Sequence, residues 1–260
     1  MKVDFGDTAE DYATFRAGFP KGLFDRLVAL EVGRSGQRLL DLGTGTGTLA
    51  RGFASRGCTV TGLDPSGPLL DQARKLAHHD GVAVEFVVGW AEGTGLPESS
   101  FDVVTAGQCW HWFERAAAAA ECRRVLRPGG ALAICYFDWI PLPGNVVAAT
   151  EALIMTHNPE WAFSGGTGMH PECASDVAQA EFEHIETLSF DVSVPYTHEA
   201  WRGRIRASAG IAASLPADAV AAFDRELAAL LSRDYPSDPL AVPHRVWALV
   251  CRAPRRPATL

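Results

Sequence analysis

Short apolar runs alternate with amphipathic stretches along the first half of the chain. An apolar run ahead of a turn, followed by apolar positions at helical spacing, is the pattern of a strand, a turn and a helix. Five runs are expected to form strands, at residues 37–42, 59–64, 82–88, 100–107 and 131–137. Helices are expected between them, at 48–57, from Pro65-Ser66 to about His78, and at 114–126, with a turn at 127–130 before the last strand. This alternation predicts a parallel, doubly wound α/β sheet.

The alternation stops after Phe137. A short helix at 146–156 and a Gly/Pro-rich passage that extends to Pro171 follow, which favours a cap inserted into the sheet. Two further strands, expected to be antiparallel, and two more helices complete the chain. These strands are expected at 182–194 and 242–251, and the helices near 199–209 and at 217–234.

A glycine-rich turn follows the first strand. It has the spacing G-x-G-x-G over Gly43–Gly47, with Asp41 two residues before the first glycine. Glycines allow a ligand to approach the backbone, and the next helix offers free N–H groups. Asp64 ends the second strand, where a carboxylate accepts hydrogen bonds from the hydroxyls of a ribose. A nucleoside joined to an amino acid describes S-adenosylmethionine (SAM).

Four ordered segments carry a family resemblance: LLDLGTGTG, VTGLDPS, VVGWAEGTGLPESSFDVV and RVLRPGG, over about residues 36–137. In order and spacing they resemble the class I SAM-dependent methyltransferases, in particular the subgroup of quinone-biosynthesis and small-acid methyltransferases. The resemblance implies a seven-stranded, mostly parallel Rossmann-like sheet with an antiparallel last strand and an inserted helical cap. It also implies SAM as cofactor and S-adenosylhomocysteine as product.

The resemblance assigns parts of the cofactor to the turns. Gly43, Thr44 and Gly45 would lie against the methionyl part, with Asp41 orienting the loop. Asp64 would bind the ribose. The remaining expected cofactor contacts follow these strands and are Pro65 and Ser66 beside the adenine, Trp90, Ala91 and Gln108.

Trp90 departs from the family pattern, which usually has Asp before Ala-Glu in this loop. An indole only donates hydrogen bonds, so Trp90 is unable to accept one from the adenine amine. Packing against the adenine face and packing in the core are the two alternatives. Glu92 is expected to brace the loop rather than to contact the cofactor.

The N-terminal stretch from Tyr12 to Pro20 resembles the Y-x-x-x-R-P-x-Y-P segment that folds over SAM in this subgroup, with Ala17 and Phe19 in place of Pro and Tyr. Tyr12 is expected to close the pocket. Arg16 is expected to pair with the methionyl carboxylate, because a guanidinium matches the two oxygens of a carboxylate; a solvated arginine is the alternative.

His111 is the candidate catalytic residue. It follows the fourth strand, and histidine titrates close enough to neutrality to take a proton from a hydroxyl or amine. Packing beneath the following helix is the alternative. Relatives that methylate carboxylates sometimes hold the acid at the positions of Gln108 and Trp110.

The cap contains many polar and aromatic side chains, each a candidate for either pocket wall or packing: Tyr136, Trp139, His157, Trp161, His170, Tyr196 and Trp201. No metal site is expected from His157, His170 and Cys173. Arg202 and Arg206 share a helix face, expected to be solvated or to hold an acidic substrate, and Arg204 lies between them in sequence.

Composition narrows the partners. The 260 residues carry 23 Lys and Arg against 31 Asp and Glu, a net charge of −8, which disfavours nucleic acid and anionic membranes. The acidic start lacks a signal-peptide pattern, and no apolar run is long enough to span a membrane, which favours a soluble cytoplasmic protein. The six scattered cysteines are expected to be buried free thiols.

We expect one methyltransferase domain over 1–260. Its SAM-binding core is expected at about 1–137, 182–196 and 240–253, and its cap at about 138–180 and 197–236. The expected acceptor is a hydroxyl or carboxylate of a small apolar or aromatic metabolite. C- or N-methylation, and a SAM-dependent cyclisation or rearrangement without transfer, are the alternatives. The oligomeric state is not predicted.

Overall fold

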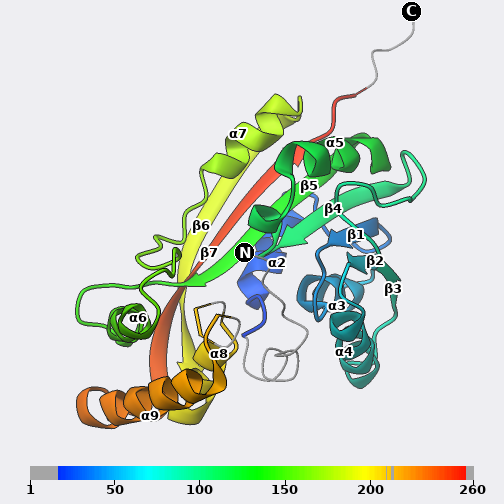
Figure 1. Cartoon of the computed structure of the whole chain (residues 1–260). Helices are drawn as coiled ribbons and strands as arrows, with labels where there is room; N and C mark the ends of the chain where they lie inside the picture. The colour runs from blue at the N-terminus through cyan, green and yellow to red at the C-terminus, as the bar shows by residue number, and fades with distance from the viewer. Residues whose placement is uncertain (1–16, 209, 212–213, 256–260) are drawn as a thin grey trace, which may run out of the picture. The chain divides into compact units, whose positions relative to one another are not determined.

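The structure is a computed structural model that describes residues 17–208, 210–211 and 214–255. Tyr12 and Arg16 lie outside these residues. Seven strands form one sheet in the order β3-β2-β1-β4-β5-β7-β6 (Figure 1). The strands are β1 (Arg38–Leu42), β2 (Thr59–Asp64), β3 (Val84–Val88), β4 (Phe101–Gly107), β5 (Leu126–Trp139), β6 (Glu183–Tyr196) and β7 (Leu240–Arg252).

The helices occupy the connections between these strands. They are α2 (Lys21–Ala29), α3 (Thr48–Ala54), α4 (Gly67–His79), α5 (Arg115–Val125), α6 (Val146–His157), α7 (Glu172–Gln179), α8 (His198–Arg206) and α9 (Ala217–Asp234), with a single 3₁₀ turn, η1 (Trp110–Trp112). The sequence pattern did not predict α2, η1 or α7, and the other elements agree with it to within a few residues except at β5.

The predicted seven-stranded mixed sheet is confirmed. Strands β1 to β5 form four parallel pairs: β1 with β2, β1 with β4, β2 with β3 and β4 with β5. The last strand is antiparallel, because Ala253 exchanges hydrogen bonds with Gly129 and Gly130 at the start of β5, whereas the Ile140 N–H, just past its end, donates to Pro243.

The prediction of a turn at 127–130 is wrong. These residues belong to β5, whose register against β4 shifts between the Phe101 and Val103 pairings. Gly129, with φ of 77°, supplies the left-handed conformation that this irregularity requires. A Pro-Gly-Gly sequence is typical of a turn, and here the hydrogen bonds of Gly129 and Gly130 to Ala253 keep it in the strand.

The chain divides into two compact units. The described residues of unit 1 are 17, 137–169 and 190–246, without 209 and 212–213, and those of unit 2 are 18–136, 170–189 and 247–255. In unit 2, α3 and α4 pack against β1 to β3, while side chains of α5 and α7 share one apolar cluster with Leu40 and Leu42 of β1 (Figure 1). Unit 2 is therefore a sheet covered by helices.

Unit 1 has its own apolar core, built by α6, α8 and α9 around the fully buried Trp201. The Trp201 indole donates to the Thr150 hydroxyl at 3.1 Å, and its ring meets those of Trp139 and Tyr196 edge to face. Trp201 is thus a packing residue, which resolves one of the alternatives left open for the cap aromatics.

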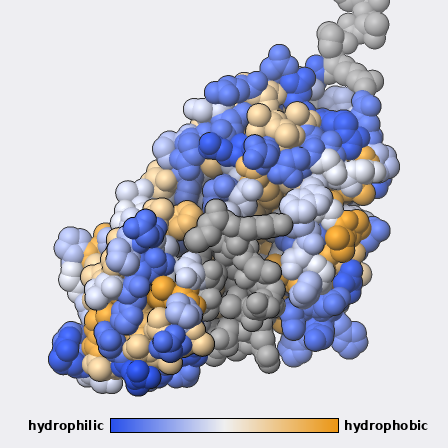
Figure 2. All heavy atoms as spheres, viewed as in Figure 1, coloured by the Kyte–Doolittle hydropathy of each residue, from blue (hydrophilic) through white to orange (hydrophobic). Residues whose placement is uncertain are grey.

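The visible surface is mostly hydrophilic, with apolar groups in small patches (Figure 2). All six cysteines are buried and none forms a disulfide, as predicted. None of the helices within the described residues has the length and apolar character needed to cross a bilayer.

Candidate functional site

The site lies where the strand order reverses. β1 pairs with β2 on one side and with β4 on the other, so the carboxyl ends of these strands, at Leu42, Asp64 and Gly107, adjoin. Ligands of open α/β sheets bind beyond the strand ends at such a point. The glycine turn that leaves β1 is therefore placed at a binding edge.

The three glycines of the turn differ in what surrounds them. All have positive φ, of 57°, 54° and 79° at Gly43, Gly45 and Gly47. A Cβ at Gly43 would lie 2.9 Å from the Cβ and Sγ of Cys109, whereas a Cβ at Gly45 would meet nothing within 4 Å. Gly43 is thus required for packing against the loop after β4, while Gly45 faces open space that a ligand can enter.

Asp41 supports the turn from below. Its buried carboxylate accepts hydrogen bonds from the hydroxyls of Thr44, at 2.6 Å, and Thr105, at 2.7 Å. Burial raises the Asp41 pKa to about 6, and these two hydrogen bonds oppose the shift. Asp41 therefore orients the loop as predicted, through contacts within the protein. Thr105 was not predicted, although a hydroxyl beside Asp41 in a buried strand pair was a usable signal.

Asp64 connects the glycine turn to the start of α4. Its Oδ2 accepts from the Gly45 N–H and its Oδ1 from the Ser66 N–H, both at 2.9 Å. Burial raises the Asp64 pKa above its usual range, and the two backbone N–H groups counteract part of this shift. Each carboxylate oxygen accepts more than one hydrogen bond, so both retain capacity for the hydroxyls of a ligand.

Ser66 and Pro65 begin the next helix. The Ser66 hydroxyl accepts from the Leu69 N–H at 3.5 Å and caps α4, and Pro65 is exposed beside it. The exposed Pro65 and the half-buried Ser66 thus lie at the end of β2, next to the loop that follows β3.

Trp90 is exposed, with 62% of its surface accessible, in the loop after β3. The alternative of a core tryptophan is therefore wrong. Ala91 beside it is buried in the apolar cluster of unit 2. Glu92 accepts from the Glu114 N–H at 2.9 Å, just ahead of α5, so it braces the loop as predicted.

The loop after β4 begins at Gln108, which has a φ of 60° and donates its N–H to the Cys135 carbonyl at 2.8 Å. Trp110 is 1% exposed and its indole donates to Asp176 of α7 at 3.0 Å. Trp110 is thus a structural residue, and of the ligand contacts predicted in this loop Gln108 and His111 remain.

His111 is exposed on η1, which contradicts the alternative of packing beneath α5. Its Nδ1 lies 3.2 Å from the hydroxyl of Tyr136, near the end of β5. Tyr136 is nearly fully buried: its ring stacks on His170 with centroids 3.5 Å apart, and its hydroxyl also bonds the Cys173 thiol. The sequence placed Tyr136 among the cap aromatics and gave no sign of this partnership.

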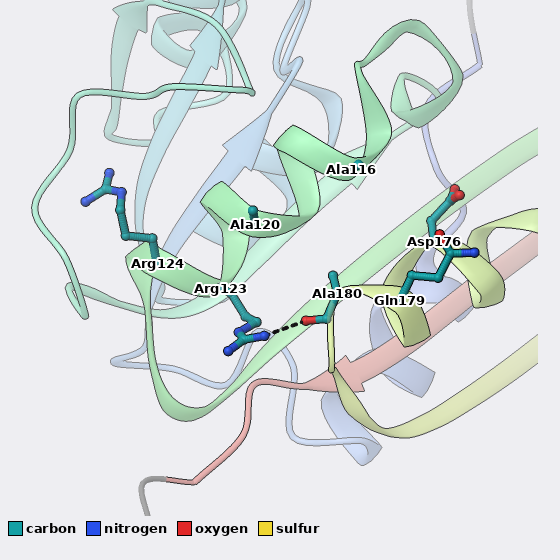
Figure 3. A pocket seen from close by; sticks show the side chains of 7 residues that line it. All are labelled: Ala116, Ala120, Arg123, Arg124, Asp176, Gln179 and Ala180. Carbon is teal, nitrogen blue, oxygen red and sulfur yellow. Dashed lines mark hydrogen bonds between the residues drawn. The ribbon is translucent and has the colours of Figure 1, made fainter.

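A groove of about 620 Å³ lies between α5 and α7, and Asp176, which accepts from the Trp110 indole, lines it (Figure 3). Arg123, on its edge, donates to the Ala180 carbonyl at 2.9 Å and pairs with Glu181. Arg124 pairs with Glu121. The cationic groups of the groove are thus neutralised within the protein, and none of the predicted site residues lines it.

The arginines of α8 differ from expectation. Arg202 and Arg206 both pair with Asp224 of α9 and with Glu199, so the predicted solvated face is wrong. Arg204 points elsewhere, over the ring of Trp139. Throughout the described residues, no group of three or more His, Cys, Asp or Glu side chains is arranged to hold a metal.

Comparison with known proteins identifies the family of this chain. Residues 40–134 match the family described as "Methyltransferase domain". An uncharacterized methyltransferase of Mycobacterium tuberculosis is 37% identical over 153 residues, 56% of this chain and 60% of that protein. The chain thus spans less than two thirds of the length of this relative.

The match to a second relative covers a larger share of that protein. The 27-O-demethylrifamycin SV methyltransferase of Amycolatopsis mediterranei is 31% identical over 203 residues, 66% of this chain and 75% of that protein. The structure of Haemonchus contortus phosphoethanolamine N-methyltransferase 2 in complex with S-adenosyl-L-methionine matches with a TM-score of 0.56 and 22% identity, over 98% of this chain and 61% of that one. This last likeness shows a shared fold.

Proposed function

We propose that this chain, which belongs to the methyltransferase-domain family of class I SAM-dependent methyltransferases, transfers a methyl group from SAM to a small molecule. The observation that carries the proposal is the arrangement at the reversal of strand order, where Asp64 bonds the Gly45 amide beside open space. That arrangement joins a carboxylate, which hydroxyls recognise, to a backbone that a ligand can approach.

The residues present fit the cofactor. Gly43, Thr44 and Gly45 would hold its methionyl part, and the spare acceptor capacity of Asp64 would take the ribose hydroxyls. Three further groups follow on the same edge of the sheet and would complete the contacts: Pro65-Ser66 and Trp90-Ala91 around the adenine, and Gln108. The exposed face of Trp90 suits an adenine ring, because both are flat and apolar on their faces. When bound, SAM supplies an activated methyl group.

Tyr12 and Arg16 are part of the proposal as well. They were predicted to close over the cofactor and to pair with its carboxylate, and both stay predictions. Neither is needed for the argument from Asp64 and the glycine turn.

The protein's part in methyl transfer is mainly positioning. An in-line displacement gains most from alignment of donor and acceptor and from exclusion of water. His111 takes the proton of the acceptor hydroxyl at its Nε2, in the tautomer whose Nδ1–H donates to the Tyr136 hydroxyl. Tyr136, fixed by His170 and Cys173, is then the positioning residue for that imidazole.

O-methylation of a small apolar or aromatic metabolite is the favoured reaction. The name of the rifamycin relative denotes an O-demethylated substrate, and the acidic net charge of −8 disfavours nucleic acid. C- and N-methylation use the same positioning and differ only in the proton that His111 must accept.

The test is a transfer assay with methyl-labelled SAM over acids, phenols, amines and a metabolite extract. Product mass and the base lability of the label are measured, since base releases the label from a methyl ester and not from an aryl ether. A labelled small-molecule product supports the proposal. Tight binding of S-adenosylhomocysteine without any labelled product supports a SAM-dependent reaction other than transfer, and absence of cofactor binding overturns both.

A further inference from the structure

Helix α8 of unit 1 carries three arginines with two different environments. Arg202 and Arg206 are each paired with Asp224 and Glu199, in a network that links α8 to α9. Two arginines and two carboxylates balance in charge. The charges of Arg202 and Arg206 are therefore neutralised by carboxylates of the protein itself.

Arg204 lies on the other side of the helix and is partly buried. Its guanidinium carbon is 4.8 Å from the centre of the Trp139 ring, and it shares a hydrogen bond with the Tyr196 phenol. Among the described residues no carboxylate lies within ion-pair distance of it, although the charge of Asp138 acts on it. A desolvated charge without a counter-ion is costly, so this position calls for an explanation.

The two aromatic walls beside Arg204 are held in place. The Trp139 indole donates to the buried Glu151 carboxylate at 2.8 Å and its ring meets that of Trp201 edge to face at 5.6 Å. The Tyr196 ring packs against Trp201 at 5.4 Å, and its hydroxyl accepts from the Ala17 N–H at 3.3 Å. The guanidinium is therefore presented by rigid neighbours, which is typical of a binding group and not of a mobile surface arginine.

His244 completes the surroundings without adding charge. It is buried, its ring stacks on Tyr196 with centroids 6.0 Å apart, and its Nδ1–H donates to the Val242 carbonyl at 3.1 Å. Burial lowers the His244 pKa to about 4, and the Arg204 charge acts in the same direction. His244 is therefore neutral near pH 7, and Arg204 is the one cation of this cluster of described residues.

We propose that Arg204, with Trp139 and Tyr196, binds the carboxylate of a small organic acid in unit 1. One guanidinium offers two parallel N–H donors that match the two oxygens of a carboxylate. A phosphate dianion would find a single cation, with the Asp138 charge close by. The aromatic walls suit the apolar body of an organic acid. In one respect this rests on the proposed function: if the chain methylates small molecules, organic acids are the class of acceptor to expect.

The test is a ligand-detected NMR titration of the full chain with benzoate and hexanoate, and with benzamide and hexanamide as uncharged counterparts. The acids are expected to bind at least about tenfold more tightly than the amides. Arg204→Gln is expected to weaken acid binding by about tenfold or more, because it removes the fork of donors. Arg202→Gln removes the same charge from the same helix and is expected to change binding by less than about twofold.

A second variant and further ligands test the same proposal independently. Should Arg204→Gln fail to fold by circular dichroism, Tyr196→Phe keeps the aromatic ring and removes the hydroxyl that bonds the guanidinium and the Ala17 N–H. This variant is expected to weaken acid binding severalfold. The proposal is overturned if the wild-type chain binds neither acid, binds acid and amide equally, prefers methyl phosphate to both acids, or loses acid binding equally in the two arginine variants. S-adenosylhomocysteine binding, measured on the same samples, shows separately whether the cofactor site and the proposed function stand.

Discussion

The Asp64 carboxylate accepts the Gly45 N–H at 2.9 Å, so the end of β2 holds the turn that follows β1. The same carboxylate accepts the Ser66 N–H and thereby holds the start of α4. One side chain thus fixes two loops that the sequence presents as separate motifs. Its removal is expected to affect ligand binding through both loops at once.

Asp64→Ala is expected to weaken S-adenosylhomocysteine binding by at least about 1 kcal/mol, the scale of a hydrogen bond to a charged group. The loss arises because the ribose hydroxyls lose their acceptor and the Gly45 amide loses its partner. Isothermal titration calorimetry measures it. Asp71→Asn is the control, since Asp71 carries the same charge on the exposed surface of α4. Unchanged affinity in a folded Asp64→Ala protein would contradict the ribose role.

Gly45→Ala separates backbone strain from ligand contact. A left-handed alanine costs roughly 1–2 kcal/mol, and this cost is shared by Gly36→Ala, whose Cβ likewise meets nothing within 4 Å in the turn before β1. Both variants are expected to lose similar unfolding free energy in urea, while only Gly45→Ala loses cofactor affinity, by about tenfold or more. Equal affinities of the two variants would place the ligand elsewhere.

Trp90 is expected to report adenine binding. Its exposed indole should lose fluorescence when S-adenosylhomocysteine stacks on it, and Trp90→Ala should weaken binding by about 1 kcal/mol. Trp90→Phe keeps an aromatic face and is expected to keep most of the affinity while losing the fluorescence change. A titration in which Trp90→Ala binds as tightly as the wild-type chain would remove the adenine contact from the site.

His111→Ala is expected to reduce turnover of a hydroxyl acceptor by about 100-fold, the lower range for general-base catalysis, with cofactor affinity nearly unchanged. Tyr136→Phe keeps the ring between His111 and His170 and removes only the hydroxyl, so a smaller loss is expected. The ¹⁵N shifts of the His111 ring give the tautomer independently of any acceptor. If Tyr136→Phe leaves both the tautomer and the turnover unaltered, the phenol has no positioning role.

Asp41 is expected to make stability depend on pH. Its pKa is raised from 3.8 to about 6 by burial, so the folded chain keeps a proton that the unfolded chain has lost in this window. Its contribution is therefore fully present below about pH 4 and is lost as the pH rises through about 6, by roughly 3 kcal/mol in total at 1.36 kcal/mol per pKa unit. Asp41→Asn should gain stability relative to the wild-type chain between about pH 4 and about pH 7 in urea unfolding. A constant difference across that range would contradict the raised pKa.

The sheet was predictable because its signals are local. The strand at Thr59–Asp64, the glycine turn and the alternation of apolar runs each depend on a few neighbouring residues, and the structure has them where the sequence predicts. The Pro-Gly-Gly segment of β5 was not predictable, since its place in the strand depends on pairing with Ala253, more than a hundred residues away.

The site was predictable in part for the same reason. The roles of Asp41 and Glu92 follow from motif position, whereas the hydrogen bond of His111 to Tyr136 joins two strand ends that spacing alone does not connect. On α8 the helical period correctly put Arg202 and Arg206 on one face, but it contains no information about Asp224, which neutralises them. Only the tertiary structure shows that Arg204 is the different one.

The buried cysteines can report local opening of the folded chain. The thiolate is the form that attacks an alkylating reagent, and burial raises the pKa of Cys58 to about 11 and of Cys173 and Cys251 to about 12. Each thiol therefore reacts when its own surroundings open. Cys58 precedes β2, Cys173 lies in α7 and Cys251 near the end of β7, so mass spectrometry of the labelling order would map which parts of unit 2 open first without any substitution.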